Sequence, residues 1–86
     1  MDIAKADKFI YHDIHDNITY ISKDFDTLME KVPNGLVCIC KAVVNTESGP
    51  MIFEMDEAYS GEPIIMRRFM HYDSYMSYYK QNIVEL

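Results

Sequence analysis

The sequence has few of the residues from which catalytic and phosphate-binding motifs are built. Its three glycines stand apart from one another, so they cannot form the glycine-rich loop that cradles a phosphate. Serine, cysteine, histidine and acidic residues are all present, but no glycine-flanked turn presents a serine nucleophile beside a base. We therefore expect a protein that is not an enzyme and that needs no cofactor.

Only two cysteines are present, Cys38 and Cys40, with one residue between them. On a strand their side chains would point the same way but lie too far apart along the chain for an easy disulfide. Their spacing also differs from the two-residue spacing of the usual zinc and thioredoxin motifs. We interpret both as small, buried hydrophobic residues of a protein in a reducing compartment.

Long apolar runs are absent as well. The sequence contains no stretch of about 18 consecutive apolar residues, and its start mixes charged and apolar side chains without the apolar run of a signal peptide. We expect no membrane-spanning segment, no membrane partner and a cytoplasmic location.

Basic residues are fewer than acidic residues, eight against fourteen, which gives a formal net charge of −6. Affinity for nucleic-acid phosphates comes from Lys and Arg, so direct nucleic-acid binding is not expected, and a basic partner is favoured. No basic residue lies between Lys41 and Arg67, and a second acidic region lies near the N-terminus. An acidic surface that only keeps the protein soluble is the alternative. The candidate partner-binding residues are Glu47, Glu54, Asp56, Glu57, Glu62, Asp13 and Asp16.

What the chain does contain is apolar residues, which make up 49% of its 86 residues. Because a chain of this length is too short for two cores, we expect a single domain over residues 1–86. One small core leaves much surface exposed, so a partner or a second copy could cover part of it.

The middle of the chain predicts a helix followed by a hairpin. Residues 24–32 carry apolar side chains at the spacing of one helical face, with Asp24 or Ser22 to cap the start and residues 33–35 to end it. Residues 36–44 are apolar on both faces, which predicts a central strand. A turn over residues 45–50 then leads to a second strand over residues 51–55.

The N-terminal third is ambiguous. Residues 9–14 and 18–21 are predicted to pair as a hairpin across residues 15–17, because residues 19–21 favour a strand. The alternative is a helix, since Ile3, Ala6, Ile10 and Ile14 approximate one helical face.

The C-terminal end has the clearest periodicity. A long helix is predicted over residues 63–84, because apolar residues recur there at alternating spacings of four and three. These residues are Ile65, Phe69, Tyr72, Met76, Tyr79, Ile83 and Leu86. The alternative makes residues 63–70 an edge strand and begins a shorter helix at Asp73.

With the long helix, the predicted fold class is α+β. It is a small antiparallel sheet covered by one short and one long C-terminal helix, in the order ββαββα.

Four residues near the N-terminus are of metal-ligand types: His12, Asp13, His15 and Asp16. On a strand His12 and His15 face opposite sides, and on a helix they would still need a third ligand. We therefore interpret the group as a polar turn and predict no metal site. A small enzyme or metal protein using these residues is the least favoured class.

Four tyrosines crowd the predicted C-terminal helix. Tyr72 and Tyr79 belong to the apolar stripe, while Tyr75 and Tyr78 lie beside it. Core packing explains the stripe, but Tyr is also enriched at protein interfaces. The alternative function is therefore a structural or regulatory homo-oligomer, such as a homodimer, assembled through Tyr72, Tyr75, Tyr78 and Tyr79.

The favoured hypothesis is a non-catalytic acidic interaction protein. Carboxylates displayed together can occupy the basic site of a nucleic-acid-binding protein or nuclease and so inhibit it. In size and charge, though in no motif, the chain resembles small acidic inhibitors of the phage anti-defence and bacterial immunity type.

Overall fold

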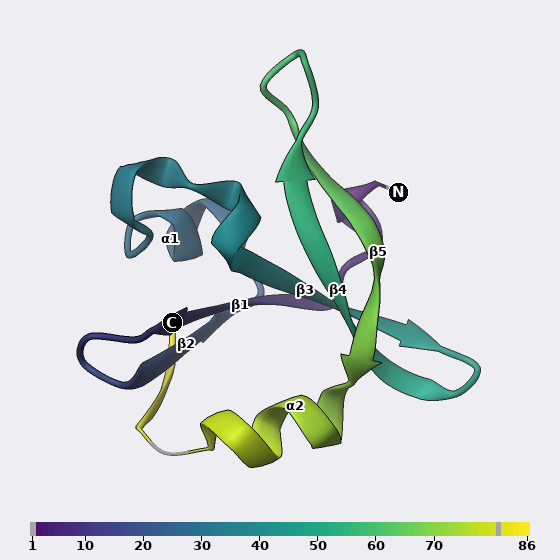
Figure 1. The fold of residues 1–86 in the computed structure, drawn as a ribbon. Coiled ribbons are helices and arrows are strands. Elements are labelled where there is room, and N and C mark those ends of the chain that lie inside the picture. The colour runs from purple at the N-terminus through teal and green to yellow at the C-terminus, as the bar shows by residue number, and fades with distance from the viewer. Residues whose placement is uncertain (1, 81) are drawn as a thin grey trace.

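The computed structural model describes residues 2–80 and 82–86, and most of them form a six-stranded mixed sheet (Figure 1). Its strands are β1 (Lys8–Asp13), β2 (Ile18–Ser22), β3 (Cys40–Thr46), β4 (Gly49–Glu57), β5 (Pro63–His71) and β6 (Ile83–Glu85). Across the sheet they lie in the order β5-β4-β3-β1-β2-β6. All neighbours are antiparallel except β2 and β6, which are parallel.

Two α-helices connect the strands. The helix α1 (Phe25–Met29) lies between β2 and β3, and α2 (Tyr72–Tyr79) lies between β5 and β6. Short 3-10 turns occur at Ile3–Lys5, Pro33–Gly35 and Val37–Ile39. Within the described residues no helix is long and apolar enough to cross a membrane.

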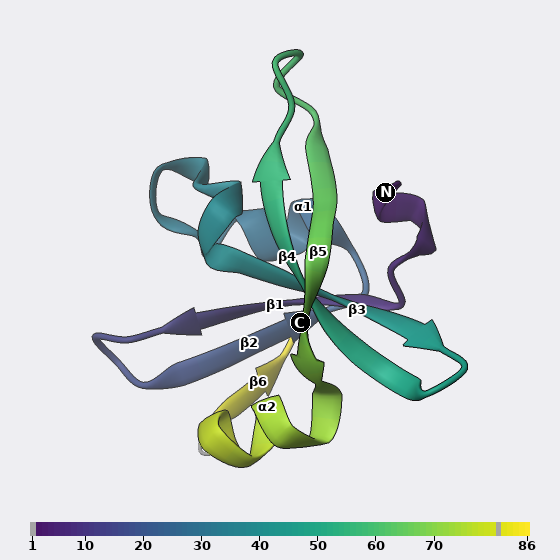
Figure 2. The ribbon, with the colours of Figure 1, turned by 45° about the vertical axis from the view of Figure 1, so that its right-hand side comes forward.

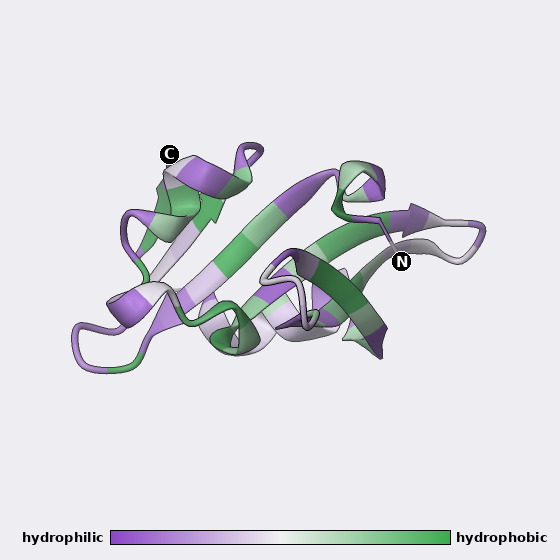
Figure 3. Ribbon diagram, turned by 90° about the horizontal axis from the view of Figure 1, so that it is seen from above, coloured by the Kyte–Doolittle hydropathy of each residue, from purple (hydrophilic) through white to green (hydrophobic). Residues whose placement is uncertain are grey.

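The two helices cover opposite faces of the sheet. Successive side chains of a strand point to opposite faces, and the core accordingly divides into two clusters. Phe9, Ala42 and Phe53 pack with Leu28 of α1 on one face. On the other face, the alternating positions Ile10, Val43 and Ile52 pack with Tyr75 of α2. Figure 3 shows the hydrophobic residues along the middle of the strands and hydrophilic residues toward the hairpin ends.

The structure confirms the predicted N-terminal hairpin and the start of the first helix, but α1 ends at Met29, whereas the helix was predicted to extend to residue 32. β1 pairs with β2, with Tyr11 opposite Tyr20. Asp24 caps α1: its carboxylate accepts hydrogen bonds from the Thr27 hydroxyl and from the Thr27 backbone N–H, and these lower the pKa of Asp24. Downstream of the helix, Asn34 and Gly35 take left-handed conformations, with φ of 56° and 63°, which turn the chain.

The predicted strand over residues 36–44 begins too early. Residues 37–39 form a 3-10 turn, and β3 starts only at Cys40. The chain has to turn here because it passes from the α1 face back into the plane of the sheet. The hairpin turn is also shorter than predicted, since Thr46 pairs with Gly49 and leaves two residues between them.

The predicted long helix over residues 63–84 is wrong, and with it the fold class of a small sheet covered by a long helix. The alternative of an edge strand followed by a shorter helix is correct: Pro63–His71 is β5, and Tyr72–Tyr79 is α2. Residues 63–71 pair with β4 from Pro63 to His71, with register shifts near Phe53, and the backbone hydrogen bonds of this pairing outweigh the apolar periodicity. Asn82, with φ of 54°, then turns the chain into β6.

The orientation of α2, which turns Tyr75 toward the core and Tyr78 toward solvent, gives a stability prediction. Tyr75 is 6% exposed and central to the α2 face of the core, whereas Tyr78 is 76% exposed. We expect Tyr75→Ala to lower the free energy of unfolding by about 3 kcal/mol, because it leaves a cavity in the core. Tyr78→Ala should change it by less than about 0.5 kcal/mol. Urea denaturation of both variants measures the difference, and equal losses would show that α2 is rotated from this orientation.

Candidate functional site

The acidic residues predicted to form one partner-binding surface lie on different hairpin ends. Asp13 is the last residue of β1, Asp16 lies in the β1–β2 turn that follows it, and Glu47 lies in the β3–β4 turn. Asp56, Glu57 and Glu62 belong to the end of the β4–β5 hairpin. Figures 1 and 2 both show these three hairpin ends pointing in different directions. The structure therefore brings three of the seven residues together at one hairpin end and two, Asp13 and Asp16, at another, while Glu47 and Glu54 lie apart from both groups.

Glu54 is placed differently from the other six. It lies within β4, and its Oε2 is 3.3 Å from Nε of Arg67 on β5. The side chains of Arg67 and Glu54 are 79% and 33% exposed, so solvent screens the pair and it adds little to stability. Because Arg67 contacts the Glu54 carboxylate, this carboxylate contributes less negative charge to the surface that a partner would contact.

The three acids that converge lie on a projecting ribbon, which we call the β4–β5 tip (residues 56–62). β3 pairs with β4 only as far as Glu54, whereas β5 continues to pair with β4 up to Glu57. The ribbon therefore extends past its neighbour as two strands alone, as Figure 2 shows at the top of the molecule.

The tip is an ordered turn despite its exposure. The Ala58 N–H donates to the Glu62 carbonyl at 2.9 Å, and the Gly61 N–H donates to the Ala58 carbonyl at 2.8 Å. Gly61 has φ of 85°, a conformation that other residues rarely adopt. Between these bonds the side chain of Tyr59 extends into solvent, with a relative exposure of 113%.

The four tyrosines of the predicted oligomer interface are mostly engaged within the molecule. Tyr75 is buried against the sheet, and burial raises its pKa well above the usual range. Tyr72 and Tyr79 are partly buried against the same cluster. The buried face of α2 is therefore centred on Tyr75, which was predicted to lie beside the apolar stripe. Only Tyr78, of these four, presents most of its ring to solvent.

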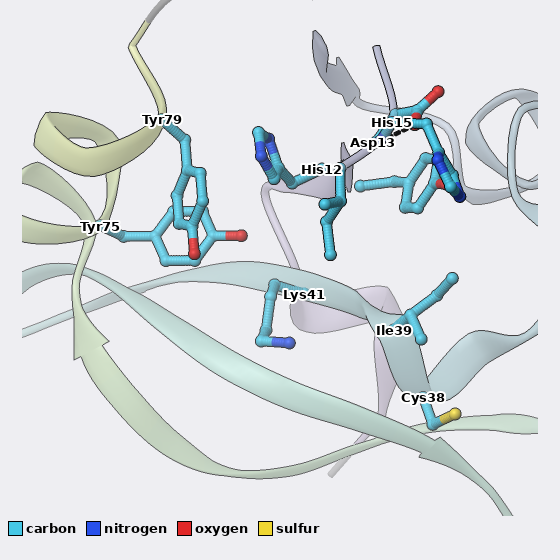
Figure 4. Close-up of a pocket in the computed structure, with 10 residues that line it drawn as sticks. His12, Asp13, His15, Cys38, Ile39, Lys41, Tyr75 and Tyr79 are labelled. Carbon is cyan, nitrogen blue, oxygen red and sulfur yellow. Dashed lines mark hydrogen bonds between the residues drawn. The ribbon is translucent and has the colours of Figure 1, made fainter. Parts of the chain in front are cut away.

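A second feature, which the sequence did not predict, is an open cleft of about 690 Å³ on the α2 face (Figure 4). We call it the Lys41 cleft. It is lined by residues 11–15 of β1 and its turn, by Cys38 and Ile39, by Lys41 of β3, and by Tyr75 and Tyr79 of α2. It forms because β1 pairs with β3 only from Lys8 to Tyr11, after which the chain before β3 turns away.

A chain of hydrogen bonds fixes His12 at the edge of this cleft. The Thr19 hydroxyl donates to the Tyr79 backbone carbonyl at 3.0 Å. Since its single proton is used there, the hydroxyl accepts from His12 Nδ1, which lies 2.9 Å away. Neutral His12 therefore carries its proton on Nδ1 and has an acceptor at Nε2. Its ring also packs on Tyr79, with the centroids 4.2 Å apart.

The four residues of the predicted polar turn do not share one environment, because some are exposed at the turn and His12 packs against α2. The Asp13 carboxylate accepts hydrogen bonds from the backbone N–H groups of His15 and Asp16 at 3.0 and 3.3 Å. His15 and Asp16 are exposed at the turn, whereas His12 packs beneath α2. In the part of the chain that the structure describes, no three His, Cys, Asp or Glu side chains are placed to share a metal ion.

The two cysteines differ in burial, although the sequence predicted that both would be buried. Cys40 is buried at the start of β3, with its Sγ 3.9 Å from the Met29 sulfur. Burial raises the pKa of Cys40 to about 11. Cys38 is exposed, because it lies in the 3-10 turn before the strand.

This difference predicts selective alkylation. Iodoacetamide at pH 8 should modify Cys38 in the folded protein and leave Cys40 unmodified, because the thiolate is the nucleophile and Cys40 is buried as a thiol. In urea both should react. Mass spectrometry of the native protein and of Cys38→Ser measures the sites, and rapid native labelling of Cys40 would contradict the placement of β3.

Comparison of the chain with protein-family models, with curated proteins and with solved structures found no match to any of them. A function for this chain therefore has to be inferred from its own geometry and charge.

Proposed function

We propose that this chain is a non-catalytic interaction protein that binds a basic surface of another protein through the β4–β5 tip. The observation that carries the proposal is the fully exposed Tyr59 between carboxylates on a projecting hairpin. Tyr is enriched at protein interfaces, where it supplies a large contact area and a polar end.

The charges around Tyr59 favour a basic partner. Asp56, Glu57 and Glu62 are exposed, and none of them forms an ion pair with a described residue. The tip itself contains no basic residue. Negative charge concentrated on a projection attracts a basic surface over a distance of about 8–10 Å at physiological salt.

The class of partner follows from this charge. A nucleic-acid-binding protein or nuclease has a basic recess that accepts phosphates, and carboxylates on a narrow ribbon have the charge to occupy it. Such binding would inhibit the partner by competing with its nucleic acid. Because the other acidic turns point elsewhere, the proposed contact is one anchored tip and not a broad imitation of a nucleic-acid backbone.

The charge of the tip can be tested with two variants that change the net charge equally. Asp56→Asn, Glu57→Gln and Glu62→Gln together neutralise the tip, and Asp13→Asn, Asp16→Asn and Glu47→Gln neutralise the other two turns. Tagged forms of the native chain and both variants are used to capture proteins from the native cell at increasing salt. We expect the native chain and the turn variant to retain the same nucleic-acid-binding protein, and the tip variant to lose it. Capture by the native chain should fall steeply as salt rises.

Equal loss in both variants would show that only net charge matters. Capture that is unaffected by salt, or a partner without a basic surface, would also contradict the proposal. The thermal unfolding of both variants serves as the control for folding.

The role of Tyr59 is tested separately by Tyr59→Ala, with Tyr78→Ala as the control. Both rings are exposed, so neither substitution should alter stability by more than about 0.5 kcal/mol. If Tyr59 anchors the interface, its removal should weaken binding to the captured partner at least about tenfold. Tyr78→Ala should leave the affinity unchanged. Surface plasmon resonance against the captured partner gives both values, and an unchanged affinity for Tyr59→Ala excludes Tyr59 as the anchor.

A further inference from the structure

We propose that the Lys41 cleft is a binding site for a small molecule with an oxyanion, a carboxylate or phosphate, on an aromatic body. The cleft shares no residue with the β4–β5 tip, so this site is separate from the proposed protein interface.

The size of the cleft suits a small ligand. Its volume of about 690 Å³ falls within the range of about 300–1,000 Å³ typical of ligand sites. Figure 4 shows Tyr75 and Tyr79 projecting from α2 toward the strand that carries Lys41, with His12 entering from β1. Groups from three separate elements therefore converge on one space.

Lys41 supplies the positive charge for the oxyanion. Its register partner across the sheet is Glu54, but the Glu54 carboxylate is bound by Arg67 instead. No described carboxylate lies within ion-pair distance of the Lys41 ammonium group, which instead lies 5.7 Å from the centroid of Phe69. Asp13, the acid of this cleft, is engaged by two backbone N–H groups of its turn. In an acidic protein this leaves a half-buried cation in a concave site.

The tyrosine hydroxyls add neutral donors. Among the described residues, no hydrogen-bond partner is seen for the Tyr75 hydroxyl, although no buried side-chain nitrogen or oxygen is left without one. Tyr75 lines the cleft while most of its side chain is buried, so the ring is held in place. A hydroxyl held in this way can donate to an anion with little loss of side-chain freedom.

The walls of the cleft favour an aromatic body. The rings of Tyr75 and Tyr79 have centroids 4.7 Å apart, and His12 packs on Tyr79. Ile39, 39% exposed, adds an aliphatic surface on the far side. A planar ring can pack on such side chains while its oxyanion contacts Lys41.

The test is a titration of the ¹⁵N-labelled protein, followed by ¹H–¹⁵N spectra, with benzoate, phenyl phosphate, neutral benzamide and inorganic phosphate as probes. We expect benzoate or phenyl phosphate to shift the signals of Ile39, Lys41, Tyr75 and Tyr79, and which of them binds more tightly identifies the oxyanion. Benzamide and inorganic phosphate should bind at least about tenfold more weakly.

Lys41→Met should weaken binding of the preferred probe at least about tenfold. Lys31→Met is the matched control, because this substitution removes the same charge. The Lys31 ammonium group also lies 5.7 Å from an aromatic centroid, that of Tyr20. Tyr79→Phe keeps the ring and should weaken binding by a smaller factor.

Absence of shifts with both aromatic acids would overturn the proposal, as would equal binding of benzamide or of inorganic phosphate. Equal weakening by the two lysine variants would show an unspecific charge effect and would also overturn it. The dispersion of the spectra establishes that each variant is folded.

Discussion

The pairing of β5 with β4 is the interaction on which the rest of this structure depends. It adds a strand at the edge of the sheet, and beyond Glu54 it forms the two-stranded ribbon that carries the β4–β5 tip. It also brings the chain at His71 to the point where α2 begins and packs on the sheet. The tip and one wall of the Lys41 cleft therefore both follow from residues 63–71 being a strand.

The same pairing separates charges of opposite sign. Arg67 of β5 reaches Glu54 of β4, and among the described residues neither the acids of the β4–β5 tip nor the Lys41 ammonium group forms an ion pair. The molecule thus presents carboxylates on projecting turns and an ammonium group within a concave face. A basic protein surface and a small oxyanion are the ligands that these two environments favour, and they involve separate residues.

The candidate site was only partly predictable. Asp56, Glu57 and Glu62 could be selected from the sequence because no basic residue lies near them, but nothing local distinguished them from Glu47 or Asp13. Tyr59 was not selected, because a single aromatic residue in a turn has no periodic signal. The Lys41 cleft depends on Thr19, Lys41 and Tyr79, which are far apart in the chain and meet only through the sheet register and the packing of α2.

The sequence favoured the first hairpin over a helix and predicted the Asp24-capped start of α1 and the β3–β4 hairpin, because turn residues, an Asp cap and alternating apolar residues act over short distances. It did not determine the state of residues 63–71. Their apolar spacing fits a helical face, but they can also pair with β4, and the hydrogen bonds of that pairing exist only once β4 is in place. The tertiary structure decided between a long helix and a strand because backbone pairing to a neighbouring strand is a non-local interaction that periodicity does not report.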